Sequence, residues 1–71
     1  MKKVCSFRKK QTGLVIDEDM NIETVIHGLR AGDTLLQVGT MKCANKPFDT
    51  VMDEIQYGKR PLRCVFSCKL R

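Results

Sequence analysis

The most informative segment of this sequence is Gly28-Leu-Arg-Ala-Gly-Asp-Thr-Leu-Leu-Gln-Val38. Its two glycines and the aspartate after the second glycine are typical of a turn, because glycine adopts positive φ angles and aspartate hydrogen-bonds to nearby backbone. The residues that follow, Thr34–Val38, are mostly apolar and predict a short strand. The segment therefore predicts a glycine-rich turn that leads directly into a core strand.

Similar patterns on both sides of this segment predict a small domain built mainly of short strands. Apolar or alternating residues indicate strands over Val4–Phe7, Leu14–Ile16, Ile22–Ile26, Met41–Cys43 and Leu62 to about Lys69. Together with the strand after the glycine-rich turn, they predict a fold of five to six short strands.

One helix is predicted to start at Lys46-Pro47, because proline suits the first turn of a helix. The i, i+3, i+4, i+7 spacing of an amphipathic helix is met by Phe48, Val51, Met52 and Ile55. Gly58 is a typical stop. The expected fold class is α+β, mainly β with one long helix packed across a partly open barrel or sandwich.

The chain has 71 residues, of which 42% are apolar and 30% are charged. These values fit one folded domain over residues 1–71, standing alone or as a module of a longer protein. Met1-Lys2-Lys3 resembles the start of a signal peptide, but the charges of Arg8, Lys9 and Lys10 interrupt any apolar stretch. No apolar run approaches the roughly 20 residues of a membrane span. We therefore expect an intracellular, cytoplasmic protein.

The formal net charge is +5, with basic residues near both ends of the chain. Such a surface is either simply solvated or attracts an anionic partner, such as nucleic acid or an anionic lipid surface. The aromatic residues are Phe7, Phe48, Tyr57 and Phe66. They are few and are not interleaved with basic residues, so they offer no stacking platform for nucleic acid. The sequence therefore argues against a nucleic-acid partner.

The four cysteines, Cys5, Cys43, Cys64 and Cys68, allow three interpretations. A disulfide framework needs an oxidising compartment, for which the sequence carries no targeting signal. A zinc site needs closely spaced pairs, whereas Cys64 and Cys68 lie about 13 Å apart along a predicted strand. We favour the third interpretation, in which the cysteines are small apolar residues of the core, and we expect no metal.

The segment Asp17-x-Asp19-x-Asn21 begins like a calcium-binding loop. However, its sixth position is Ile22, where the sharp turn needs glycine. Its twelfth position is Gly28, where calcium needs a bidentate glutamate. The segment is therefore predicted to be an acidic hairpin turn and not a calcium site.

The order of these features resembles that of a PDZ domain, from about Val4 to Cys68. The shared features are a glycine loop, a strand, a hairpin, a second strand, the Gly-x-x-x-Gly-Asp turn, another strand, the helix, Arg60-Pro61 and a final strand. The chain is short for this family, and Ile26-His27 runs directly into Gly28, where the family carries its first helix. The resemblance implies a protein–protein interaction module.

The resemblance also implies a site for the free carboxylate of a partner peptide. The family's Gly-Leu-Gly-Phe loop is matched by Gly13-Leu14-Val15-Ile16. The amides of Leu14, Val15 and Ile16 are then the carboxylate donors, because convergent backbone N–H groups bind anions. The family often carries a basic residue shortly before this loop. The candidates that assist in binding the carboxylate are Arg8, Lys9 and Lys10.

The peptide is then expected to add as a strand along Leu14–Glu18, including Asp17, with the helix as the other wall of a groove. In the family the first helical residue sorts ligands, and this position falls on Phe48, with Met52 one turn later. Both are apolar, so an apolar ligand residue third from the end fits better than a hydroxyl. The pocket for the apolar last residue is expected to be lined by Leu14, Ile16 and Met52. Plain core positions are the alternative for Phe48 and Met52.

Other classes of function remain open. A PDZ-like scaffold without carboxylate binding would self-associate through an exposed strand edge, for instance as a homodimer. A basic surface that binds nucleic acid or anionic lipid is a third class. An enzyme is not expected, because the single histidine, His27, has no recognisable partner for nucleophilic catalysis. No catalytic constellation and no cofactor motif occurs in the sequence.

Overall fold

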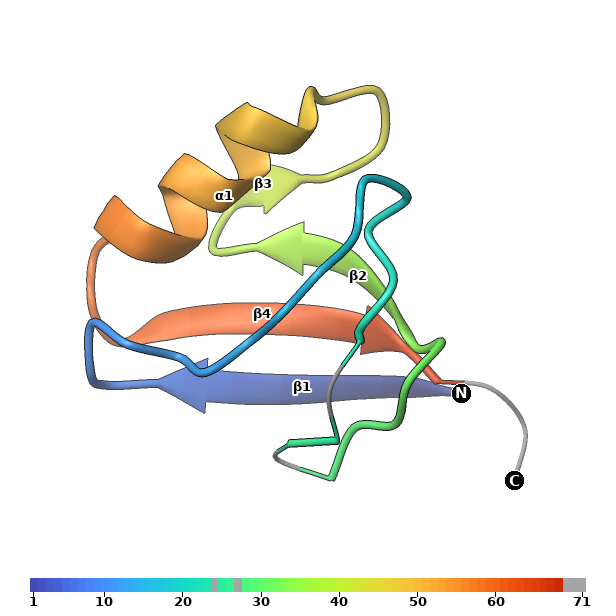
Figure 1. The fold of residues 1–71 in the computed structure, drawn as a ribbon. Helices are drawn as coiled ribbons and strands as arrows, with labels where there is room; N and C mark the ends of the chain where they lie inside the picture. Colours follow the sequence, from blue (N-terminus) through green and yellow to red (C-terminus); the bar gives the residue numbers. More distant parts are fainter. Residues whose placement is uncertain (24, 27, 69–71) are drawn as a thin grey trace.

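A computed structural model describes residues 1–23, 25–26 and 28–68 of the chain. Within these residues, one helix accompanies a four-stranded antiparallel sheet with the strand order β1-β4-β2-β3 (Figure 1). The elements are β1 (Lys2–Phe7), β2 (Thr34–Val38), β3 (Met41–Lys42), α1 (Phe48–Tyr57) and β4 (Leu62–Ser67). The predicted α+β class is confirmed.

The core lies on one face of the sheet, and the central strand β4 supplies much of it. The buried residues of β4 are Leu62, Cys64 and Phe66, every second residue of the strand. Helix α1 adds Val51 and Ile55 to the same apolar cluster. Removing this apolar surface from water is the main force that holds the helix against the sheet.

The predicted strands Leu14–Ile16 and Ile22–Ile26 do not form strands within the described residues. They pair through the single bridge Ile16–Ile22, and the second arm then pairs with other segments. The N–H of Ile22 donates to the Asp33 carbonyl at 2.6 Å, and the Ile22 carbonyl accepts from the Gly32 N–H at 2.8 Å. These bonds use the edge of Ile22 that faces away from Ile16, and further along the second arm Ile26 bridges Leu29 and not the first arm, so the hairpin ladder stays short. The expected number of five to six strands is therefore not confirmed. Thr24, His27 and Lys69 lie outside the described residues.

The glycine-rich turn and the strand that follows it are confirmed. Gly28 and Gly32 have φ angles of 78° and 94°, in the left-handed region that favours glycine. The Asp33 side chain is only 1% exposed, and its Oδ2 accepts from the Arg30 N–H at 2.8 Å. Leu29, between the glycines, has no exposed surface and belongs to the core.

The predicted helix is also confirmed, at both of its ends. Pro47 precedes the first helical residue, Phe48, and Gly58 follows the last. The Gly58 N–H donates to the Glu54 carbonyl at 2.8 Å and closes the final turn. A Cβ at Gly58 would collide with the Glu54 carbonyl oxygen, so the chain can leave the helix here only with glycine.

The acidic segment forms the predicted hairpin turn. Asp17 Oδ1 accepts from the backbone N–H groups of Asp19 and Asn21, each at 2.9 Å. This arrangement is the usual way in which an aspartate side chain stabilises a turn.

Three of the four cysteines are core residues, as predicted. Cys43, Cys64 and Cys68 are buried, while Cys5 is half-buried and packs against the same cluster. All four carry free thiols. Cys5 and Cys64 are cross-strand partners in the β1–β4 pair. Burial raises the pKa of the thiols of Cys5, Cys43 and Cys64, so these thiols stay protonated at neutral pH.

Raising the pH above about 9 is expected to destabilise the protein, because burial raises the pKa of the Cys64 thiol from 9.0 to about 12, with smaller contributions from Cys5 and Cys43. The folded protein holds this proton more tightly than the unfolded chain does. Its stabilising effect is therefore complete below pH 9 and is lost between pH 9 and 12. In this range the free energy of unfolding should fall by about 1.4 kcal/mol per pH unit.

Urea titrations at about pH 8 and about pH 10, on the protein and on Cys64→Ala, measure this dependence. The variant starts less stable because it has a cavity, but its stability should fall less with pH. Equal losses in the two proteins would show that the Cys64 thiol is not held protonated by burial.

Candidate functional site

The residues singled out from the sequence lie beside a hollow of about 370 Å³ between the loop after β1 and helix α1. Figure 1 shows the segment after this loop passing across the fold, with α1 on one side and the returning arm of the hairpin on the other. The hollow is lined by Lys10, Gln11, Thr12, Gly13, Leu14, Met52, Ile55 and Gln56. The structure thus brings together four of the predicted site residues, Lys10, Gly13, Leu14 and Met52.

The other predicted residues lie elsewhere. Val15 is 45% exposed, whereas the Ile16 side chain is buried in the core. Phe48 begins α1 and packs, half-buried, against the core, so it does not line the hollow. Arg8 and Lys9 line a neighbouring hollow of about 360 Å³. Asp17 organises the hairpin turn and is not part of either lining.

Gly13 shapes the start of this segment. Its φ angle is 75°, and a Cβ at this position would lie 2.6 Å from Ile26 Cδ1. Any side chain here would therefore strain the backbone and would require the end of the Ile26 side chain to move. The next amide, the Leu14 N–H, donates to Thr12 Oγ1 at 3.2 Å. One of the three expected carboxylate donors is thus already engaged within the loop.

The backbone N–H and C=O of Ile16 form an unpaired edge of the hairpin. The Glu23 N–H donates to the Val15 carbonyl at 2.8 Å, and the Asp17 N–H donates to the Asn21 carbonyl at 3.0 Å. These two bonds flank the Ile16–Ile22 pair, so the N–H and C=O of Ile16 point away from the returning arm of the hairpin. Among the described residues, neither group has a recorded hydrogen-bond partner. An added strand pairs with unpaired backbone groups of this kind.

Arg60 fixes the loop that forms one end of the hollow. Its guanidinium donates to the Lys9 carbonyl at 2.8 Å and to the Lys10 carbonyl at 2.7 Å. The same group donates to the carbonyls of Gly58 and Ile55, each at 2.8 Å, at the end of α1. Arg60 therefore ties the loop to the helix. The sequence assigned no role to this residue, although Arg60-Pro61 was part of the family resemblance.

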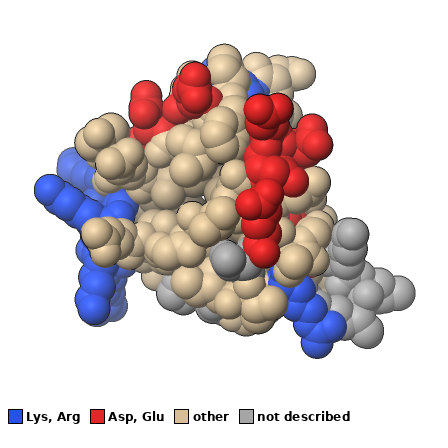
Figure 2. Space-filling view, viewed as in Figure 1, with Lys and Arg blue, Asp and Glu red and all other residues tan. Residues whose placement is uncertain are grey.

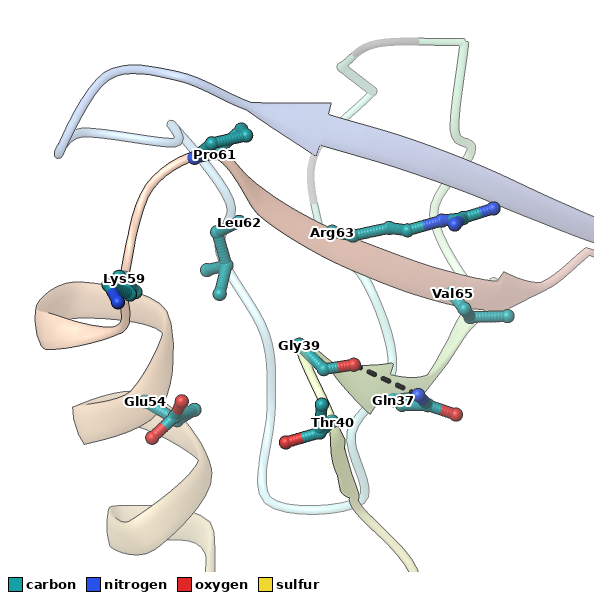
Figure 3. Close-up of a pocket in the computed structure, with 9 residues that line it drawn as sticks. All are labelled: Gln37, Gly39, Thr40, Glu54, Lys59, Pro61, Leu62, Arg63 and Val65. Atoms are coloured by element: carbon teal, nitrogen blue, oxygen red, sulfur yellow. Dashed lines mark hydrogen bonds between the residues drawn. The ribbon is translucent and has the colours of Figure 1, made fainter.

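A larger hollow, of about 600 Å³, lies on the other side of α1 (Figure 3). Its lining includes Glu54, Lys59 and Arg63. In Figure 3 the Arg63 side chain extends away from Glu54 and Lys59, so these charged groups do not converge on a common point. The backbone of this region is also used internally, since β2 pairs with both β3 and β4. This hollow therefore lacks the open edge found at Ile16.

Within residues 1–23, 25–26 and 28–68, no group of three or more His, Cys, Asp and Glu side chains is placed to hold a metal ion. In the same part of the chain, α1 falls short of the length and apolar character that a bilayer-spanning helix requires. A scan against protein-family models finds no match to the chain, and searches of curated proteins and of solved structures find none either.

Proposed function

We propose that this protein is a PDZ-like interaction module that binds an apolar C-terminal peptide by strand addition. The observation that carries this proposal is the unpaired backbone edge at Ile16, two residues after Leu14, which lines the hollow together with Met52 and Ile55. An added strand gains main-chain hydrogen bonds from such an edge and side-chain contacts from such a wall. In this proposal the two hairpin arms act as the further strands of a PDZ-like sheet.

The bound peptide runs antiparallel to Leu14–Glu18, and its carboxylate lies at the Gly13-Leu14 end. The amides of Leu14, Val15 and Ile16 are the proposed donors, with the Leu14 amide exchanging its bond to Thr12 for one to the ligand. Lys10 is the basic residue in the lining that assists the carboxylate. The last side chain of the peptide contacts Leu14 and Met52.

The composition of the hollow supports a role in binding. It combines apolar side chains with backbone groups, as peptide grooves usually do.

We also propose that the module acts in the cytoplasm, where free thiols such as those of the four cysteines persist.

Self-association is the second candidate function, and the edge of the sheet favours it. β1 pairs with β4 along one side. Val4, near the middle of β1, is 46% exposed. Two copies pairing along β1 would bury this edge. Size measurements over a range of protein concentrations distinguish this assembly from a monomeric peptide-binding module.

The test of the proposed function is an amide chemical-shift titration with peptides that end in three apolar residues, each as the free acid and as the amide. We expect the free acids alone to shift the resonances of Leu14–Asp17 and Met52–Gln56. Equal responses to both forms would remove the carboxylate from the proposal. No response at millimolar peptide would reject peptide binding at this groove.

The substitution Leu14→Lys is expected to weaken peptide binding more than tenfold, because it places a charge in the apolar part of the groove. Val25→Lys is the matched control, since Val25 is 77% exposed, does not line the hollow and is not one of the proposed donors. The affinity of this variant should stay within about twofold of that of the unmodified protein. Similar losses in both variants would show that the added charge itself, and not its place in the hollow, weakens binding.

A further inference from the structure

Charge is unevenly distributed along the groove. Figure 2 shows basic groups gathered at the left, a smaller basic group at the lower right, and acidic groups that flank a neutral central surface above and to the right. The basic end holds the exposed side chains of Arg8, Lys9 and Lys10, in the loop after β1. The opposite end holds the acidic hairpin turn and the start of α1 (Figure 1).

Exposed acidic groups lie on the two elements at that end, which we call the acidic walls. In the hairpin turn, Glu18 and Asp19 are exposed, and Asp19 also lines a hollow with Met20 and Cys43. On helix α1, Asp49 and Asp53 are exposed. Residues 49, 52, 53 and 56 follow the i, i+3, i+4, i+7 spacing, so these two aspartates share the helix face that lines the hollow.

We propose that the partner of this groove is a C-terminal peptide that carries Lys or Arg in the third to fifth positions before its last residue. The inference rests on the proposed function. The carboxylate occupies the basic end, and the turn residues Asp17–Asp19 lie three to five residues beyond Leu14. In an antiparallel peptide the residues at that distance from the end lie beside the turn and the start of α1.

The same arrangement disfavours other occupants. A phosphate polymer or an anionic lipid surface would meet two acidic walls along the groove, although the whole protein is basic. The net charge of +5 by itself predicts tighter binding of acidic peptides. Tighter binding of basic than of acidic peptides would therefore have to come from the acidic walls. The two explanations predict opposite preferences, so the measured preference decides between them.

The experiment compares two peptides that share three apolar residues and a free carboxylate at the end. One carries three lysines in the preceding three positions, and the other carries three glutamates. At about 50 mM salt we expect the lysine peptide to bind about tenfold more tightly, from three exposed charge contacts. At about 1 M salt, where charges are screened beyond about 3 Å, the two affinities should converge.

Two matched variants locate the effect. Asp53→Lys should reduce the preference for the lysine peptide to about threefold or less. Glu54→Lys introduces the same charge at the next residue, but Glu54 faces the hollow of Figure 3 and not the groove, so the preference should persist. The salt dependence of the unmodified protein tests the proposal even where a variant folds poorly.

The outcomes separate this inference from the proposed function. Equal binding of both peptides, or tighter binding of the glutamate peptide, would overturn the inferred charge preference and leave peptide binding intact. Failure of both free acids to bind would overturn the proposed function and the inference with it. Binding of amides and acids alike, with the lysine preference retained, would support the acidic walls but not the carboxylate end.

Discussion

Replacing Arg60 with alanine is expected to lower the free energy of unfolding by about 2 to 3 kcal/mol, since several charge-assisted hydrogen bonds are lost and some are solvent-exposed. The carbonyls of Gly58 and Ile55 at the end of α1 lose their partner, as do those of Lys9 and Lys10 in the loop. We also expect faster amide hydrogen exchange over residues 10–14, because the loop is no longer tied to the helix.

The variant Arg60→Lys separates geometry from charge. Lysine keeps the charge but lacks the planar fork that reaches four carbonyl oxygens at once, so it should recover less than half of the lost stability. Arg63→Ala is the control for Arg60→Ala, because Arg63 is exposed on β4 and the two substitutions change the net charge by the same amount. Wild-type stability and exchange rates in Arg60→Lys would show that the four contacts contribute little.

The same variants bear on peptide binding. In the proposed groove the loop that Arg60 holds forms the carboxylate end, so its release should weaken binding of the free acids by about tenfold. This loss should not appear in Arg63→Ala. Arg60 would then act as a positioning residue that does not itself contact the ligand.

The parts of the fold that were predicted from the sequence are those with strong local signals. The strand Thr34–Val38 follows a turn whose glycines require positive φ angles, and its boundaries agree with β2. Helix α1 has proline before its first residue and glycine after its last, with the buried residues Val51 and Ile55 at the expected spacing. In each case residues next to the element in the sequence mark where it begins or ends.

The arms of the hairpin were not predicted correctly as strands, because a strand depends on its partner. Leu14–Ile16 and Ile22–Ile26 have suitable residues, but among the described residues the two arms share one bridge, Ile16–Ile22, and Ile26 bridges Leu29 instead. Nothing in the local pattern indicates Leu29 as a partner. The hydrogen bonds of Val15 and Asp17 on either side of the Ile16–Ile22 bridge leave the Ile16 backbone groups unpaired, which is the feature that supports the proposed function.

The candidate site was predicted in part for a similar reason. Lys10, Gly13, Leu14 and Met52 were chosen through the family resemblance, and they line one hollow. Arg60 was missed because two of its acceptors are backbone carbonyls 50 and 51 residues away in the sequence. A carbonyl has no residue-specific signature, so such a contact is found only when the fold is known.

Replacing Leu29 with alanine is expected to cost about 2 to 5 kcal/mol of stability, the range measured when a buried leucine is truncated. Leu29 has no exposed surface, and its side chain joins the glycine-rich turn to the core. A chain of this size has a total stability of about 4 to 10 kcal/mol, so the variant should be close to unfolding at room temperature. The midpoint of urea unfolding should fall by more than about 1 M.

Val25→Ala is the control for Leu29→Ala, because Val25 lies four residues earlier and is 77% exposed. Its stability should change by no more than about 0.5 kcal/mol. The contrast tests whether the glycine-rich turn is part of the core or only a surface connection. A loss below about 1 kcal/mol in Leu29→Ala would place the turn outside the core, since a leucine with no exposed surface cannot be truncated at so small a cost. Asp33, which holds the hairpin arm at Ile22, would then not connect that arm to the core. The same would be true of Ile16, the partner of Ile22, on whose backbone groups the proposed peptide groove depends.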